Sequence, residues 1–484
     1  MSHRWIWLLA IPIVYLLFFF RMGAVGLLGP DEPRYASIGR EMAVSGDFVT
    51  PRLWGEAWFE KPAFLYWLIA AGYRAGLSVD VAPRLPIALL SVLFLSGFFA
   101  LVRRLYDGAT GAAATTILAT CAAWIAFSHV AVTDLPLAAC FSTAVLLALA
   151  APTGRGRATA TWMTAAGVCL GAGMLAKGLV PVVLATPLVW LFRRRWRELA
   201  WLYGAAVLVA APWYVAVSAR NGAPFWNEFL WKHHFDRFAS DALQHQQPFW
   251  FYIPVLLGAL FPWTPLLALV PARSVWTSGV NRALVLMAGF GLAFFSASTN
   301  KLPGYLLPIL PLLSVVVGNA MIKSPRAGAA LAGCAVLLVG IPLIAEILPP
   351  ALDAGITKAP FEFRHLLPAL PVALLAAAAW RLPRHLTMAL VAAAVALGVA
   401  YLKIRTYPVL DERVSARTLW RRVEGKQACV EEIHRAWRYG LNFYSVRPLP
   451  ACEGEAGAVL RITQEPGEPP RVAATSSPSA SSLP

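Results

Sequence analysis

Charged residues are scarce in this chain. Only 14% of its 484 residues are Asp, Glu, Lys or Arg, whereas 58% are hydrophobic, and the mean hydropathy is +0.62. A soluble globular domain carries about 25% charged residues, so this composition excludes that class. It predicts a membrane protein that crosses the bilayer many times.

Acidic residues are the scarcer of the two signs. The chain has 25 of them against 41 Lys and Arg, which gives a formal net charge of +16. In a soluble protein such an excess would suggest nucleic acid, but here the arginines lie in short clusters between apolar runs. The excess of Lys and Arg in cytoplasmic loops explains this pattern better, and we expect no nucleic-acid partner.

The six cysteines form no disulfide framework, and the chain shows no internal repeat. Four cysteines lie inside apolar runs, and only Cys429 and Cys452, near the C-terminus, could pair on an oxidising side of a membrane. No small-residue cleavage site follows the first apolar run, residues 5–20, so we expect it to remain as a membrane span.

The apolar runs predict an all-α polytopic protein. At roughly twenty residues per crossing they give about thirteen spans within a membrane domain of residues 1–403. After the first run, spans are expected to begin near Arg84, Ala109, Leu135, Trp162, Leu179, Leu199, Phe249, Ala283, Tyr305, Gly328, Leu366 and Leu386.

Alternate loops are rich in arginine and lysine, which predicts a cytoplasmic N-terminus. The basic loops contain Arg103 and Arg104, Arg155 and Arg157, residues 193–197, Arg273 and Arg282, Lys323 and Arg326, and Arg381 and Arg384. The opposite loops and the C-terminal segment are then expected in the periplasm of a bacterial inner membrane.

The first outer loop, residues 22–83, is a polar island between apolar runs. Asp31 and Glu32 precede Pro33, as at a helix start, and a helix is expected to run to Ser45 and stop at Gly46. A second helix should carry residues 64–67, with 62–76 lying along the membrane interface.

Two motifs in this loop, DEPRYA (31–36) and FEKPAFLYW (59–67), resemble the first periplasmic loop of bacterial lipid-linked sugar transferases. That family includes the aminoarabinose transferase acting on lipid A and the related protein mannosyltransferases. The resemblance implies a GT-C fold, a polyprenyl phosphate (undecaprenyl phosphate) sugar donor and transfer with inversion to an acceptor such as lipid A, another envelope glycan or a protein.

Two aspartates are the expected catalytic residues. The resemblance places Asp31 at the catalytic centre, and Asp134, at the outer start of a span, matches a second acidic residue of the family. A helix cap is the alternative interpretation for either residue. Together they could ligate a divalent metal, Mg²⁺ or Mn²⁺.

Basic and hydroxyl side chains are expected to bind the donor phosphate. Lys61 stands at a helix start, where backbone N–H groups also meet anions, and Lys301 and Tyr305 belong to KLPGYLLP, which resembles a family segment. A snorkelling interfacial side chain is the alternative for Lys61, and a plain turn and anchor is the alternative for Lys301 and Tyr305. The other candidates are Arg34, Tyr35, His234 and Arg237, with weaker support for Lys177 and Glu60.

The C-terminal region is expected to form a small periplasmic α/β cap over residues 404–464. Strands are expected at 427–433 and 458–462 with a helix at 437–445 between them, and residues 465–484 are expected to be disordered.

Two other functions compete with an enzyme. A transporter or flippase for polyprenyl-linked sugars would need charges near the bilayer midplane and related halves, which the sequence lacks. A non-catalytic binder would be expected to lose Asp31 or Lys61, and both are present.

Overall fold

The computed structural model describes residues 3–154, 156–236, 247–354, 362–452, 460–465 and 467–474. Within these residues, seven helical segments are long and apolar enough to cross a membrane. They are α4 (Leu85–Leu105), α8 (Arg157–Lys177), α11 (Trp196–Asn221), α16 (Gly279–Ala297), η4 with α17 (Pro303–Ile309 and Leu310–Lys323), α18 with α19 (Ala327–Leu337 and Gly340–Ala354) and α21 (Arg384–Arg413).

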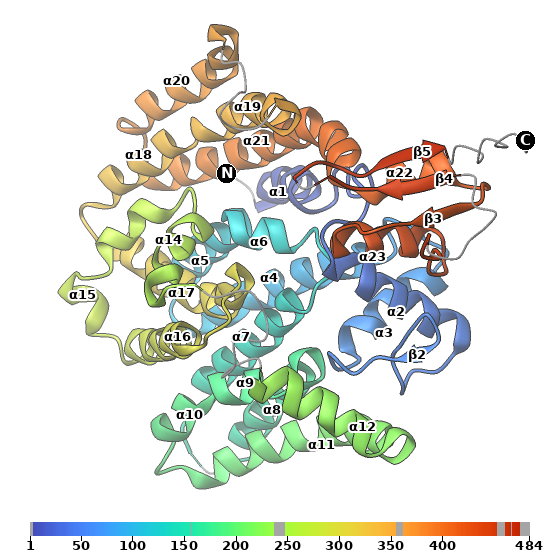
Figure 1. Cartoon of the computed structure of the whole chain (residues 1–484). Coiled ribbons are helices and arrows are strands. Elements are labelled where there is room, and N and C mark those ends of the chain that lie inside the picture. The colour runs from blue at the N-terminus through green and yellow to red at the C-terminus, as the bar shows by residue number, and fades with distance from the viewer. Residues whose placement is uncertain are drawn as a thin grey trace, which may run out of the picture.

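Shorter apolar helices lie between these segments (Figure 1). Several are broken near a proline, which removes a backbone donor and ends or kinks a helix. The shorter helices, of which α1 precedes all the long segments, are α1 (His3–Phe18), α5 (Gly108–Thr120), α6 (Ala122–Phe127), α7 (Asp134–Ala150), α9 (Val180–Leu184), α10 (Thr186–Leu191), η2 (Phe249–Phe251), α14 (Tyr252–Ala259), η3 (Thr264–Leu269), η5 (Phe363–Ala369) and α20 (Leu370–Ala379). The polytopic α-helical fold is confirmed, while the number thirteen stays a prediction.

Small residues set the closest helix contacts. α8 packs between α7 and α11, and at Gly167 an added Cβ would lie 2.2 Å from the carbonyl oxygen of Leu202 on α11. Any larger side chain would force these two helices apart. Because lipid is as apolar as the helix surfaces, no hydrophobic effect holds membrane helices together, and the close packing that glycine allows stabilises their contact instead.

The first loop folds as its turn signals predict. α2 (Asp31–Ser45) ends at Gly46, which is left-handed with φ 74° and donates its N–H to Met42. A short hairpin of β1 (Arg52–Leu53) and β2 (Glu56–Ala57) follows, and then α3 (Phe64–Arg74). α3 packs on α2, so the loop is a compact unit that can hold side chains in fixed positions.

The C-terminal segment is the small α/β unit that the sequence predicts. It contains α22 (Ala416–Val423), β3 (Ala428–Val430), α23 (Arg435–Tyr444), β4 (Leu460–Thr463) and β5 (Arg471–Ala474), with strand order β3-β4-β5. A disulfide joins Cys429 to Cys452, the one pair that the sequence left open. One expectation is wrong: the stretch from 465 onward is not wholly disordered, because β5 pairs antiparallel with β4. α21 also runs past the expected boundary at Lys403, to Arg413.

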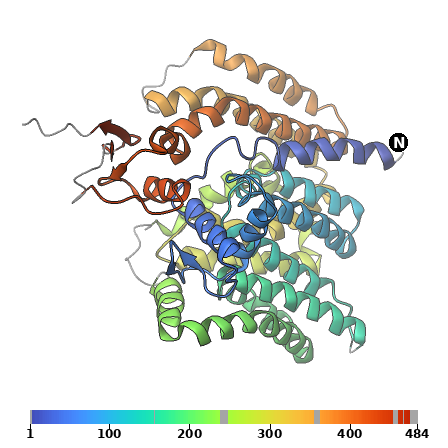
Figure 2. The ribbon, with the colours of Figure 1, turned by 90° about the vertical axis from the view of Figure 1, so that its right-hand side faces the viewer.

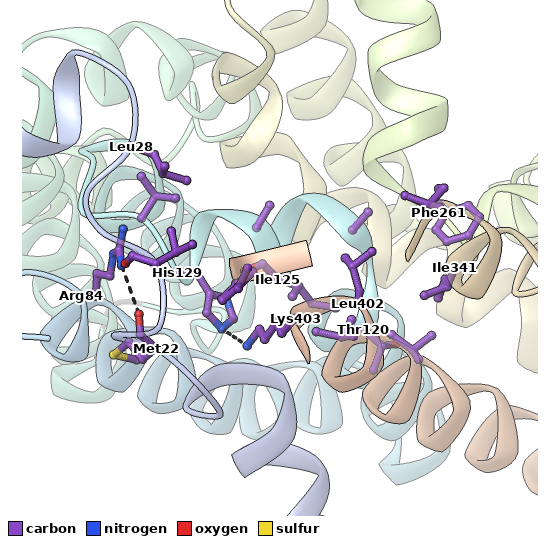
Figure 3. A pocket seen from close by; sticks show the side chains of 18 of the residues that line it. Met22, Leu28, Arg84, Thr120, Ile125, His129, Phe261, Ile341, Leu402 and Lys403 are labelled. Carbon is purple, nitrogen blue, oxygen red and sulfur yellow. Dashed lines mark hydrogen bonds between the residues drawn. The ribbon is translucent and has the colours of Figure 1, made fainter. Parts of the chain in front are cut away.

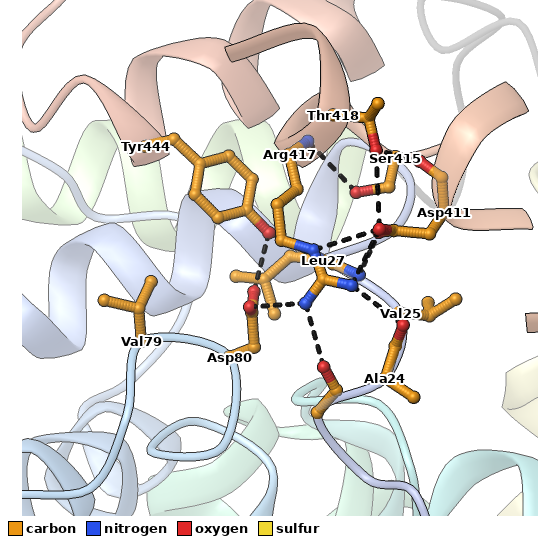
Figure 4. A network of polar contacts seen from close by, with 12 residues as sticks. Ala24, Val25, Leu27, Val79, Asp80, Asp411, Ser415, Arg417, Thr418 and Tyr444 are labelled. Carbon is orange, nitrogen blue, oxygen red and sulfur yellow. Dashed lines mark hydrogen bonds and ion pairs between the residues drawn. The ribbon is translucent and has the colours of Figure 1, made fainter. Parts of the chain in front are cut away.

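One arginine fastens this segment to the first loop (Figure 4). Arg417 Nη1 lies 2.8 Å from Asp80 Oδ2, Arg417 Nη2 lies 2.8 Å from Asp411 Oδ2, and the guanidinium also donates to the carbonyls of Gly23 and Ala24. The Tyr444 hydroxyl donates to Asp80 at 2.6 Å. Figure 2 shows the first loop and the C-terminal segment together at one end of the helical body, opposite the N-terminus.

Candidate active site

Glu60 lies at the centre of the polar contacts of the first loop. Its side chain is only 7% exposed, and Oε2 lies 2.8 Å from Arg34 Nη2 while Oε1 lies 3.1 Å from Lys61 Nζ. The Tyr35 hydroxyl also donates to Oε1, at 3.4 Å. Glu60 therefore joins the start of α2 to the residues that precede α3, although the motifs supported it only weakly as a site residue.

The Asp31 carboxylate forms an ion pair and is also partly exposed to solvent. Its Oδ1 lies 2.6 Å from Arg34 Nη2, yet the side chain is 44% exposed. The N-cap of α2 is Pro30, and no side chain caps this helix, so Asp31 is not a helix cap. The contact with Arg34 orients the carboxylate and leaves it accessible from outside the protein.

Burial and charge fix the protonation of the groups around Asp31. Although burial opposes the charge on Arg34, the carboxylates of Glu60 and Asp31 keep the pKa of its guanidinium above the usual value. Burial, together with the charge of Glu60, holds the pKa of the Tyr35 hydroxyl well above its usual range. Tyr35 thus stays protonated at neutral pH and donates its hydrogen bond to Glu60.

Glu32, next to Asp31, has a different task. It is fully buried and forms a two-pronged ion pair with Arg84, with both N–O distances 2.7 Å. Arg84 also donates to the carbonyls of Met22, Val25 and Gly26. Because both charged groups are fully paired, they fix the path of the chain into α2. No sequence signal linked these two residues.

A second polar cluster joins three segments that lie far apart in the sequence. Lys177 Nζ lies 2.8 Å from Asp134 Oδ1 and 4.8 Å from the centroid of the Tyr305 ring. An added Cβ on Gly304 would lie 2.8 Å from Asp134 Oδ1, so glycine is needed at that position. Asp134 is an ion-pair partner here and does not cap α7, whose N-cap is Thr133.

Lys301 turns inward beside this cluster. It is buried, and its ammonium donates to the carbonyl oxygens of Ser298 at 2.6 Å and Gln247 at 2.9 Å. Both of these acceptors are neutral carbonyls, which orient the ammonium without neutralising its charge.

Comparison with known proteins identifies this arrangement. Residues 4–229 match the family described as dolichyl-phosphate-mannose-protein mannosyltransferase. A protein of Pseudomonas aeruginosa (strain UCBPP-PA14) named undecaprenyl phosphate-alpha-4-amino-4-deoxy-L-arabinose arabinosyl transferase is 36% identical over 362 residues, which cover 71% of this chain and 65% of that protein. A protein of Edwardsiella ictaluri (strain 93-146) with the same name is 34% identical over 376 residues, covering 73% and 66%.

A solved structure agrees with these relatives. The crystal structure of ArnT from Cupriavidus metallidurans bound to undecaprenyl phosphate superposes with a TM-score of 0.75 at 25% identity, covering 93% of this chain and 86% of that chain. In sequence and in fold, the chain is therefore similar to lipid-linked sugar transferases. It spans about two thirds of the length of the P. aeruginosa relative, 65%.

The two carboxylates expected at the catalytic centre lie in separate ion pairs, Asp31 with Arg34 and Asp134 with Lys177. A hydrogen bond joins the segments next to the two aspartates, since the backbone N–H of Ala131 donates to the Glu32 carboxylate at 3.1 Å. Among the described residues, no group of three or more His, Cys, Asp or Glu could hold a metal ion. The binding of Mg²⁺ or Mn²⁺ by Asp31 and Asp134 stays a prediction, and each carboxylate already faces a cation.

The structure does not describe the side chains of two predicted phosphate ligands. Arg237 falls outside the described residues, and of His234 only the backbone is described, within the π-helix η1 (Asn227–Asp236) that follows α12 (Ala223–Trp226). Their contact with phosphate stays a prediction.

The GT-C body also contains a mainly apolar cavity of about 370 Å³ (Figure 3). It lies between α6, α19, α21 and the start of α4, and its lining includes Ile125, Ile341 and Leu402. Lys403 and His129 point toward each other at one side, with Nζ 2.6 Å from Nε2. An apolar cavity with a basic side has the chemistry to hold a lipid chain that carries a polar end.

Proposed function

We propose that this protein is an inverting glycosyltransferase that moves a sugar from a polyprenyl phosphate to an acceptor at the periplasmic face. The observation that carries the proposal is the partly exposed carboxylate of Asp31, which Arg34 orients, with Lys61 held in the same cluster by Glu60. The proposed setting is the bacterial inner membrane, with the N-terminus in the cytoplasm and the C-terminal segment in the periplasm.

The names of the relatives supply the proposed donor, which is undecaprenyl phosphate carrying 4-amino-4-deoxy-L-arabinose. The undecaprenyl phosphate bound in the C. metallidurans structure supports the same lipid carrier. The proposed acceptor is lipid A, with another envelope glycan or a protein as the other classes.

In the proposed reaction, an acceptor oxygen attacks the sugar carbon as its bond to the phosphate oxygen breaks, and the phosphate leaves with the bonding electrons. Asp31 receives the proton of a hydroxyl acceptor, or orients an acceptor that is already an anionic phosphate. Lys61, Lys301, Tyr305 and Arg237 are the proposed groups that meet the charge growing on the leaving phosphate.

The test uses purified protein with undecaprenyl-phosphate sugars and a panel of lipid A, other glycans and peptides. We expect the wild type to consume donor only when acceptor is present and to release free undecaprenyl phosphate. Asp31→Asn should lower the rate at least about 100-fold if Asp31 takes the proton of a hydroxyl acceptor. Transport or binding alone would leave the donor intact.

Asp107→Asn is the matched control. Asp107 caps α5 by accepting from Thr110 N, and asparagine caps a helix equally well, so this variant should keep the wild-type rate. Equal rates for Asp31→Asn and Asp107→Asn would refute the role of Asp31.

A further inference from the structure

The hairpin of the first loop contains an unfavourable residue at its turn. Leu53 pairs with Glu56, so Trp54 and Gly55 form a two-residue turn, and their φ values are 55° and 89°. Turns with two positive φ values favour Asn followed by Gly, whereas a bulky side chain at the first position is strained. Backbone strain of this kind persists where other interactions of the residue offset its energetic cost, often at functional sites.

The indole of Trp54 meets a residue from the far end of the chain. Its ring stacks on the ring of Tyr439 in α23, with centroids 5.8 Å apart and planes at 23°. The guanidinium of Arg34 lies 5.4 Å from the Tyr439 ring and 5.5 Å from the Trp58 ring. The rings of Tyr35, Trp58 and Tyr439 therefore surround the arginine that orients Asp31, and Trp54 joins this group by stacking on Tyr439.

Several donors in this group have no acceptor. Within the described part of the chain, Trp54 Nε1, Trp58 Nε1 and Arg34 Nε are buried and make no hydrogen bond. Indole and guanidinium nitrogens only donate, so an oxygen of a water molecule or of a ligand that enters between the rings would satisfy them. Three unsatisfied donors around one arginine indicate a site that is completed by a ligand rich in acceptor oxygens.

Charge and shape decide between the ligands that offer such oxygens. Arg34 and Lys61 are already paired with Asp31 and Glu60, so this group of four is neutral overall. A phosphate has no apolar face to lay on the aromatic rings, whereas a sugar ring offers neutral hydroxyl oxygens to the N–H groups and an apolar face to the rings. We propose that Trp54, Trp58 and Tyr439 form a sugar-binding subsite beside Asp31, which the C-terminal segment completes.

This subsite rests on the proposed function, and its test measures binding separately from transfer. The probes are undecaprenyl phosphate without sugar, undecaprenyl-phosphate aminoarabinose and lipid A, each titrated into detergent-solubilised wild type and variants by calorimetry. Trp54→Asn removes the ring while relieving the backbone, and Tyr439→Leu removes the stacking partner. We expect each variant to weaken one sugar-bearing probe about tenfold, the loss of one good contact, while leaving undecaprenyl phosphate unchanged.

The probe that weakens identifies the source of the sugar, since loss for the donor lipid assigns the donor sugar and loss for lipid A assigns the acceptor sugar. Trp276→Leu, an exposed tryptophan on α15 (Arg273–Trp276), is the control and should bind every probe as the wild type does. Unchanged binding in both variants, or an equal loss for undecaprenyl phosphate, would overturn the subsite. A wild type that binds the sugar lipids but transfers no sugar would instead count against the proposed function alone.

Discussion

Glu60 contacts two cations at once, Arg34 and Lys61, whose side chains are each 11% exposed. Glu60→Gln keeps the shape of the side chain but removes the carboxylate charge that faces both cations. We expect a loss of about 3 kcal/mol in stability, because removal of one partner leaves buried charge uncompensated. Activity should fall as well, since Arg34 would no longer be held beside Asp31.

Thermal unfolding and steady-state kinetics check this expectation. Glu56→Gln, four residues earlier on the exposed strand β2, removes the same charge and should change neither quantity. If the two variants behave alike, Glu60 does not organise the loop.

Metal removal tests the expected role of the two aspartates. Asp31 and Asp134 already face Arg34 and Lys177, and a cation beside each carboxylate opposes the binding of a second positive charge. We therefore expect the transfer rate to stay within about twofold after EDTA treatment and dialysis, a change too small for the loss of a catalytic metal. A large loss that Mg²⁺ or Mn²⁺ restores would show that a metal does bind.

The sequence predicted which residues belong to the candidate site, but it did not predict which side chains they contact. The motifs pointed to Asp31, Lys61 and Tyr305, and these lie in the polar clusters that the structure describes. Pairs such as Glu32 with Arg84 join residues 52 positions apart in the chain. Sequence spacing carries no information on such contacts, because tertiary packing alone brings the partners together.

At the scale of elements, Arg417 connects α22 to the first loop through Asp80, Asp411 and two backbone carbonyls. Arg417→Gln should loosen the C-terminal segment, expose it to limited proteolysis and lower activity, because Tyr439 would lose its position over Arg34. Arg422→Gln is the control, since Arg422 is 60% exposed and lies 3.8 Å from Glu412. Equal proteolysis of the two variants would contradict this account.

Elements with a clear local signal were predicted well. α2 was expected from its acidic start and its glycine stop, and β3, α23 and β4 from their hydrophobic periodicity. β5 was missed because its four residues lie in a stretch rich in Pro and Gly and gain order only by pairing with β4. The extension of α21 to Arg413 was also missed, since its last turns are polar and pack against α22.

For the whole molecule, the distribution of arginine predicts which end faces the cytoplasm. Glu56, in the hairpin, and Arg194, between α10 and α11, are both at exposed positions that suit single cysteine labels. We expect an impermeant maleimide to label Glu56→Cys in intact spheroplasts and Arg194→Cys only after permeabilisation. The reverse pattern would place the candidate active site in the cytoplasm.

The contacts of Arg417 and Tyr444 also set an order of assembly. Their common partner Asp80 is 337 and 364 residues earlier in the chain, so the ribosome makes it long before either of them. The first loop is thus incompletely supported until residues 417 and 444 have been synthesised. A stop codon upstream of Arg417 would remove both contacts of Asp80 and leave the first loop without this support.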